Sequence, residues 1–214
     1  MENQEIKDEI RKEFQLDRII LFSDAVFAIV ITLMAIEIRL PKNSTETFSL
    51  QMLHLVPVII AYAASFGFIG QIWYQHLQVF GLLKGYDKGL IIRNLFMLFW
   101  IGFFPFSVTL IEEKSNNFLS IIIYFLVVFI CKGAQLMLQY YILVKRPELR
   151  VINGAHAELV RYKKSRLAII LLVIVFILVT STMLILKNSE MMYFAWWWFF
   201  PFPFILKYFQ KRIK

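Results

Sequence analysis

The sequence predicts an all-α, polytopic membrane protein with six transmembrane helices. Of its 214 residues, 59% are apolar and only 18% are charged. A soluble domain of this size rarely carries so little polar surface. The chain also contains six long apolar stretches, and about 20 helical residues are enough to cross a hydrocarbon core of roughly 30 Å.

Charged residues, prolines and glycines mark the ends of these stretches. We expect the transmembrane helices at about residues 19–38, 53–79, 90–111, 118–144, 167–186 and 191–209, which makes 1–214 a single six-span domain.

Two segments of this layout have further features. The fourth linker, 145–166, is long, and its apolar residues recur near helical spacing, so it is either an amphipathic surface helix or a solvated loop. In the last span, Pro201 and Pro203 are expected to break or kink the helix, and the aromatic run 196–204 is expected to face lipid.

Basic residues alternate between the linkers. Four precede the first span and seven lie in the fourth linker, whereas the opposite set holds only Arg39, Lys42, Lys114 and Lys187. Because cytoplasmic loops retain Lys and Arg, this pattern predicts a cell-membrane protein with both termini in the cytoplasm. The net charge of +8 is divided among these clusters, so we expect the lipid bilayer, and no nucleic acid, as a partner.

The first span contains a carboxylate, Asp24. A charge inside a membrane helix costs about 2.5 to 3.5 kcal/mol even on insertion scales, so Asp24 needs a polar partner. Arg18 lies six residues earlier and does not share its face of the helix. The partner is therefore expected from another span at the same depth, where the candidates are Trp73, His76, Arg93 and Asn94. Such a polar network also has a purely structural interpretation, in which it only holds the helices together.

The motif around this carboxylate resembles a known family. Arg18, Phe22, Ser23 and Asp24 form the pattern Arg-x-x-x-Phe-Ser-Asp, and Thr32 follows eight residues after the Asp. This resembles the transmembrane protein 175 family of potassium channels. The resemblance extends to the six-span layout, to Trp73 and His76 late in the second span, and to Asn94 with the later Pro105 and Phe106 of the third span. The family's bacterial members carry one six-span repeat and assemble as tetramers. The single repeat of this chain resembles that bacterial form, which implies a homotetramer.

The same resemblance implies a pore lined by the first span. Ile29, Thr32 and Ile36 share one helical face, which Leu33 flanks, and they match the family's pore-lining and constricting positions. Potassium would pass near Ile29 and Thr32, and no structural metal is expected. Without the motif, such a stripe indicates ordinary packing.

The sequence Thr-Val-Gly-Tyr-Gly, which forms the common potassium filter from backbone carbonyls, does not occur. Selectivity must therefore arise in another way, and the resemblance implies a hydrophobic gate, a ring of four Ile29 side chains that passes partly dehydrated ions. Potassium holds its water more loosely than sodium, so we expect modest potassium selectivity, with rubidium or caesium also permeant. No cofactor is expected.

Other functions remain open at this stage. A secondary transporter is one alternative, although no inverted repeat is visible. A membrane protein with a structural polar network at Ser23 and Asp24 is another. An enzyme is not expected, because Ser23, Asp24 and His76 come with no nucleophile elbow, phosphate loop or metal motif.

Arg18, Asp24 and three polar residues of the fourth span each have more than one interpretation. Arg18 pairs with acidic headgroups, caps the network or anchors the helix at the membrane surface. Asp24 acts as a scaffold or contacts ions directly. Lys132, Gln135 and Gln139 share one face of the fourth span and would line a subunit interface or a water-filled crevice, with an acidic or carbonyl partner for Lys132.

Overall fold

The computed structural model describes residues 2–36, 38–39, 47–113, 118–186 and 202–211. The chain forms two compact units, Met1–Val151 and Ile152–Lys214, which we describe separately. Within the described residues, 5 helices are long and apolar enough to cross a membrane, which confirms the predicted all-α membrane fold. Most of the sixth predicted span, 191–209, lies outside the described residues, as does most of the aromatic run 196–204.

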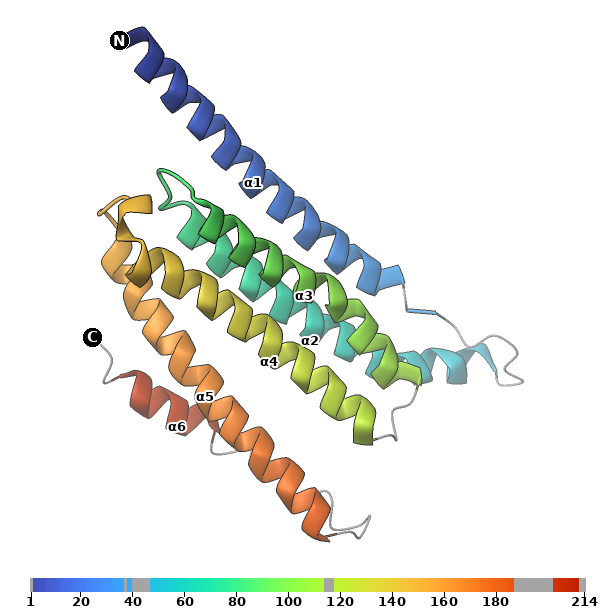
Figure 1. Ribbon diagram of the computed structural model, residues 1–214. Coiled ribbons are helices and arrows are strands. Elements are labelled where there is room, and N and C mark those ends of the chain that lie inside the picture. Colours follow the sequence, from blue (N-terminus) through green and yellow to red (C-terminus); the bar gives the residue numbers. More distant parts are fainter. Residues whose placement is uncertain (1, 37, 40–46, 114–117, 187–201, 212–214) are drawn as a thin grey trace. The chain divides into compact units, whose positions relative to one another are not determined.

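The first unit contains the first four long helices (Figure 1). They are α1 (Glu2–Ile36), α2 (Phe48–Phe80), α3 (Lys88–Glu113) and α4 (Phe118–Tyr140), followed by a π-helical turn (Tyr141–Lys145) and a 3-10 turn (Pro147–Leu149). Helix α3 contacts α1, α2 and α4, so it is the central element of this unit.

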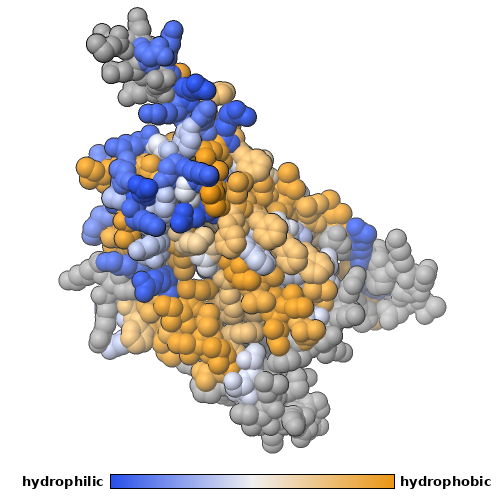
Figure 2. Space-filling view, in the orientation of Figure 1, coloured by the Kyte–Doolittle hydropathy of each residue, from blue (hydrophilic) through white to orange (hydrophobic). Residues whose placement is uncertain are grey.

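Helix α1 begins at Glu2 rather than near residue 19, where the first span was predicted to begin. Its 35 residues correspond to a length of about 52 Å, which exceeds a hydrocarbon core of roughly 30 Å. Its first turns are rich in charged residues, and Figure 2 shows hydrophilic side chains at this end of the helix, next to an apolar surface. The helix therefore continues from water into the membrane without interruption.

The second unit contains α5 (Ala155–Leu186) and α6 (Phe202–Gln210). Helix α5 starts just after Gly154, whose φ of 83° favours glycine. The linker 145–166 was predicted to be a surface helix or a loop, but its residues 155–166 form the first turns of α5 and are continuous with the fifth predicted span. Pro203 is the second residue of α6, where the missing N–H breaks no helical bond, while Pro201 lies outside the described residues.

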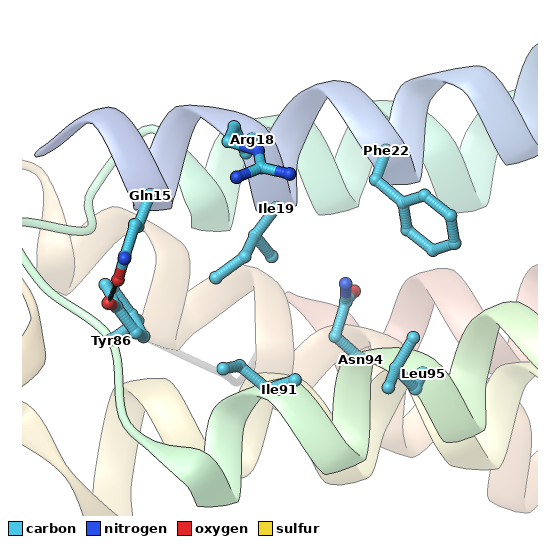
Figure 3. A pocket seen from close by; sticks show the side chains of 8 residues that line it. All are labelled: Gln15, Arg18, Ile19, Phe22, Tyr86, Ile91, Asn94 and Leu95. Carbon is cyan, nitrogen blue, oxygen red and sulfur yellow. Dashed lines mark hydrogen bonds between the residues drawn. The ribbon is translucent and has the colours of Figure 1, made fainter. Parts of the chain in front are cut away.

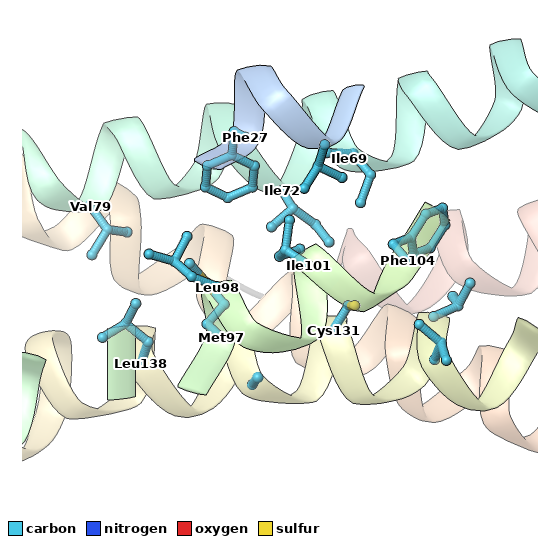
Figure 4. Close-up of a cluster of buried hydrophobic side chains, with 14 of the residues drawn as sticks. Phe27, Ile69, Ile72, Val79, Met97, Leu98, Ile101, Phe104, Cys131 and Leu138 are labelled. Carbon is cyan, nitrogen blue, oxygen red and sulfur yellow. The ribbon is translucent and has the colours of Figure 1, made fainter. Parts of the chain in front are cut away.

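A cluster of buried apolar side chains fills the first unit (Figure 4). Phe27 of α1 packs among α2 and α3, and the ring of Phe68 in α2 stacks on Phe104 of α3 with centroids 5.5 Å apart. Lipid tails are as apolar as these side chains, so close packing, and not exclusion of water, stabilises the contacts between the helices. Packing of this kind determines which way each helix faces.

A second group of contacts closes the unit at the connection between α2 and α3. Asp87 caps α3 by accepting a hydrogen bond from the N–H of Leu90 (2.7 Å), and it accepts another from the hydroxyl of Tyr141 (2.5 Å). Partial burial alone would raise the pKa of Asp87, but these hydrogen bonds and the nearby Arg146 and Arg93 lower that pKa below its usual value. Its carboxylate is therefore charged at neutral pH and joins α3 to the end of α4.

Gly89 allows this close approach, because a Cβ at position 89 would overlap the hydroxyl of Tyr141. We expect Gly89→Ala to lower the free energy of unfolding by about 1–3 kcal/mol, as overpacking does. Thermal unfolding of the purified protein in detergent would measure this loss.

Gly85→Ala is the matched control, since a Cβ there meets nothing within 4 Å. Equal melting temperatures for the two variants would contradict the proposed overlap.

Candidate functional site

Five polar side chains meet where α1, α2 and α3 pack together, and we call them the polar network: Ser23, Asp24, Trp73, His76 and Asn94. Trp73 Nε1 donates to Asp24 Oδ1 (2.9 Å), and Asn94 Nδ2 donates to Ser23 Oγ (2.9 Å). His76 Nε2 lies 3.0 Å from Asn94 Oδ1. Asp24 thus has a partner from another span, which a carboxylate at this depth requires.

The direction of the hydrogen bonds in the network follows from the donors available. Ser23 Oγ donates to the carbonyl of Ile19 (2.8 Å), so it accepts from Asn94 Nδ2 with a lone pair. The amide oxygen of Asn94 then faces His76, and only a protonated Nε2 can donate to it. The three helices are therefore joined by a continuous chain of hydrogen bonds, in which His76 donates to Asn94, Asn94 donates to Ser23, and Ser23 donates to its own helix.

Packing holds this chain in place. Ser23, His76 and Asn94 are almost completely buried. The His76 ring stacks on Phe80 with centroids 3.8 Å apart and lies 5.7 Å from the ring of Phe27. The imidazole has little freedom to turn away from Asn94, so the network fixes the rotation of α1 about its own axis.

Arg93 lies outside the network, although the sequence placed it among the candidates. Its guanidinium donates to the carbonyl of Gly89 (2.9 Å) and lies 4.1 Å from the centroid of the Tyr141 ring. Adjacent residues of a helix point about 100° apart. Asn94 therefore faces α1 and α2, while Arg93 faces the end of α4.

The opposite face of α1 is free within the subunit. Ile29 and Ile36 are 56% and 59% exposed, whereas Phe27 on the packed face is 1% exposed. Thr32 and Leu33 are exposed on the same side as Ile29. We call Ile29, Thr32, Leu33 and Ile36 the exposed stripe. No helix of the first unit covers it.

The hydroxyl of Thr32 donates back to its own helix, toward the carbonyls of Ala28 (3.0 Å) and Ile29 (2.9 Å). Its proton is engaged there, so the lone pairs of its oxygen are directed away from the helix axis. This arrangement presents an acceptor, and not a donor, on the exposed stripe.

The polar residues of α4 do not lie on a free surface. Lys132, Gln135 and Gln139 are all buried within the first unit, which differs from the predicted subunit interface or crevice. Lys132 Nζ donates to the side-chain carbonyls of Gln75 (2.8 Å) and Gln135 (2.7 Å). The sequence analysis missed Gln75, although an amide within an apolar span is itself a signal of a polar contact.

Comparison with known proteins identifies a family that matches this part of the chain. Residues 18–105 match the model of a family described as the endosomal/lysosomal potassium channel TMEM175. The matched segment includes the whole polar network and the exposed stripe.

Individual relatives carry related descriptions. The chain is 36% identical over 90 residues to a protein of Chryseobacterium sp. (strain P1-3) named as a potassium channel, covering 42% of this chain and 45% of that one. It is 35% identical over 108 residues to a protein of Chamaesiphon minutus with the same description, covering 49% and 53%. The matches thus span about half the length of these relatives.

The fold is similar over a much longer range. The crystal structure of a lysosomal potassium-selective channel TMEM175 homolog from Chamaesiphon minutus superposes with a TM-score of 0.66 at 24% identity, covering 94% of this chain and 98% of that one. The fold described above is therefore shared well beyond the matched segment.

The bond between Trp73 and Asp24 can be tested by substitution. Trp73→Phe removes the indole N–H and leaves the carboxylate without this donor, so we expect a loss of about 1–3 kcal/mol in the free energy of unfolding. A double-mutant cycle with Asp24→Asn, followed by thermal unfolding in detergent, would measure the coupling between the two side chains.

Trp100→Phe is the matched control, because Trp100 Nε1 is buried without a hydrogen-bond partner in the described structure. A coupling energy near zero, or an equal loss in the control, would show that the bond does not hold α1 in place.

Proposed function

We propose that this chain, which belongs to the TMEM175 family through residues 18–105, forms a potassium-permeable cation channel. One observation carries the proposal: α1 buries one face in the subunit through the family's motif and leaves the exposed stripe free. An apolar stripe that bears a single acceptor oxygen suits a pore lining. The names of the relatives add support, since two are described as potassium channels.

The pore needs several copies of the chain, because one exposed stripe cannot enclose a path for ions. In the proposed homotetramer, four α1 helices surround a common axis and turn their exposed stripes inward. Ile29 then forms an apolar ring, Leu33 flanks it and Ile36 continues it by two turns. The polar network acts as a scaffold that sets the rotation of each α1.

The apolar ring explains the proposed selectivity. A hydrophobic constriction closes by losing its water, and it passes an ion only when the ion gives up part of its hydration shell. Potassium releases water more readily than sodium, so the ring favours potassium, with rubidium and caesium permeant as well. The selectivity is modest because isoleucine supplies no ligands in place of the lost water.

Thr32 supplies a ligand for the ion next to the ring of Ile29 side chains. Its hydroxyl proton is engaged by carbonyls of α1. In the proposed tetramer its oxygen therefore faces the pore axis, with lone pairs free to bind a cation. Four copies would offer four oxygens one turn from Ile29. Potassium would therefore pause near Ile29 and Thr32, and the channel needs no cofactor or structural metal.

The proposed location is a cell membrane, with both termini in the cytoplasm. The support for this orientation is the concentration of Lys and Arg before the first span and between the fourth and fifth spans. A secondary transporter is the alternative function. In that case the polar network would be a purely structural feature.

Potassium flux into liposomes tests the proposal. The purified protein should pass potassium down its gradient without a second solute, and Ile29→Asn should raise the sodium-to-potassium permeability ratio several-fold by hydrating the ring. Fluorescent measurement of flux for both ions, or bilayer recording, would give the ratio.

Ile174→Asn is the control, since Ile174 is an exposed isoleucine of α5. Flux that saturates and requires a coupled solute would instead indicate a transporter. Unchanged permeability ratios across substitutions at Ile29, Leu33 and Ile36 would show that α1 does not line the pore.

Thr32 gives a separate prediction. Thr32→Val keeps the shape of the side chain but removes its oxygen, so we expect a potassium conductance several-fold lower, while Thr32→Ser keeps the oxygen and most of the conductance. Single-channel recording would compare the two. Equal conductance in both variants would show that the hydroxyl does not contact ions.

A further inference from the structure

A cavity of about 390 Å³ opens between α1 and α3, next to the connection from α2 to α3 (Figure 3). It is distinct from the exposed stripe, which lies further along α1. One end is lined by Gln15, Arg18 and Tyr86, and the other by Phe22, Asn94 and Leu95.

The two ends of the cavity differ in polarity. Tyr86 belongs to the connection, where the chain leaves the membrane, whereas Leu95 lies seven residues into α3, a distance of about 10 Å along the helix. The side chains of Ile19 and Phe22 point from α1 toward α3, with Ile19 midway along the cavity and Phe22 at its deeper end (Figure 3). The cavity thus runs from the membrane surface toward the hydrocarbon.

The polar groups around the cavity are satisfied, with one exception. The Tyr86 hydroxyl donates to the side-chain carbonyl of Gln15, and the amide of Asn94 is engaged in the polar network. The guanidinium of Arg18 is exposed and has no hydrogen bond or ion pair within the described residues. The next residue toward the N-terminus, Asp17, lines a different cavity against α2 and does not neutralise this one.

The geometry points to a binding site for an acidic phospholipid, with its phosphate on Arg18 and the first part of one acyl chain over Ile19, Phe22 and Leu95. A guanidinium binds phosphate oxygens through two parallel hydrogen bonds. The cavity has a cationic end at the surface and an apolar end further inward. A lipid of the nearest leaflet has its headgroup and acyl chain in the same order. A free phosphate would leave the apolar end unused.

The cavity volume limits what enters. Pockets for small ligands range over roughly 300–1,000 Å³, so a cavity at the low end of this range holds a phosphate ester and the start of one chain, with the remainder lying along the exposed surface of α1 and α3. Basic residues near an anionic membrane surface are attracted to it in any case. Phosphatidylcholine carries the same phosphate, so a preference for the acidic head must come from the repulsion between its choline cation and Arg18. General attraction by the other basic residues of α1 would persist without Arg18.

Lipid titration of the purified full-length protein tests this site. Phosphatidylglycerol and phosphatidylcholine with identical acyl chains would be added to the protein in detergent, and bound lipid would be counted by native mass spectrometry. We expect the unaltered protein to bind phosphatidylglycerol at least tenfold more tightly than phosphatidylcholine. Arg18→Gln should abolish this preference, and Arg18→Lys should retain part of it.

Two further variants locate the lipid. Lys12→Gln is the matched control, because Lys12 is an exposed cation of α1 that lines the other cavity, and we expect less than a twofold change in affinity. Leu95→Trp fills the apolar end and should weaken the binding of both lipids about tenfold, which a headgroup contact at the surface would not do.

Several results would overturn the inference. These are equal binding of the two lipids, an Arg18→Gln variant that keeps its preference, and a Leu95→Trp variant with unchanged affinity. Displacement of the lipid from the unaltered protein by millimolar inorganic phosphate would assign the site to free anions.

The unaltered protein and Leu95→Trp keep the test decisive should Arg18→Gln fail to fold. Lipid binding is measured without ion flux, so failure of the proposed channel leaves this result independent.

Discussion

The fold of the first unit depends on the need to satisfy polar side chains where no water is available. In hydrocarbon each unpaired polar group costs several kcal/mol, so the side chains that α1, α2 and α3 bring to the same depth must find one another. Ser23, Asn94 and His76 do so in one directed chain, and Trp73 holds Asp24 beside it. This pairing fixes which face of α1 is turned inward, and hence which face remains for function.

The remaining contacts join the helices to one another in pairs. Helix α3 is the centre, with α1 on one side and α4 on another, and its start is capped by Asp87, which also holds the end of α4 through Tyr141. Helix α4 is joined to α2 by Lys132, whose ammonium is surrounded by amide oxygens. Three of the four helices are thus tied to one another away from the exposed stripe, so the residues that join these helices are separate from those of the stripe.

Much of this could be predicted from the sequence, and the errors have a common cause. Length and apolar content predicted the membrane helices, and the carboxylate within an apolar stretch indicated that Asp24 needs a partner on a neighbouring helix. The rotation of each helix could not be predicted, so Arg93 was grouped with Asn94 although they point to different neighbours. For the same reason Lys132 was expected at a subunit interface or a water-filled crevice, and not buried within the subunit. The starts of α1 and α5 were also placed too late, because apolar content marks where a membrane begins and not where a helix begins. Assembly was predicted from the family resemblance and not from any pattern of residues in this chain.

The continuity of α1 has a mechanical consequence. No proline or glycine occurs between Glu2 and Ile36, so the helix lacks the two residue types that most often kink a helix. A force applied in water at its charged beginning is then transmitted as a change of tilt along its whole length. The polar network holds the helix partway along its length, so its charged beginning and Ile36 lie on opposite sides of this contact.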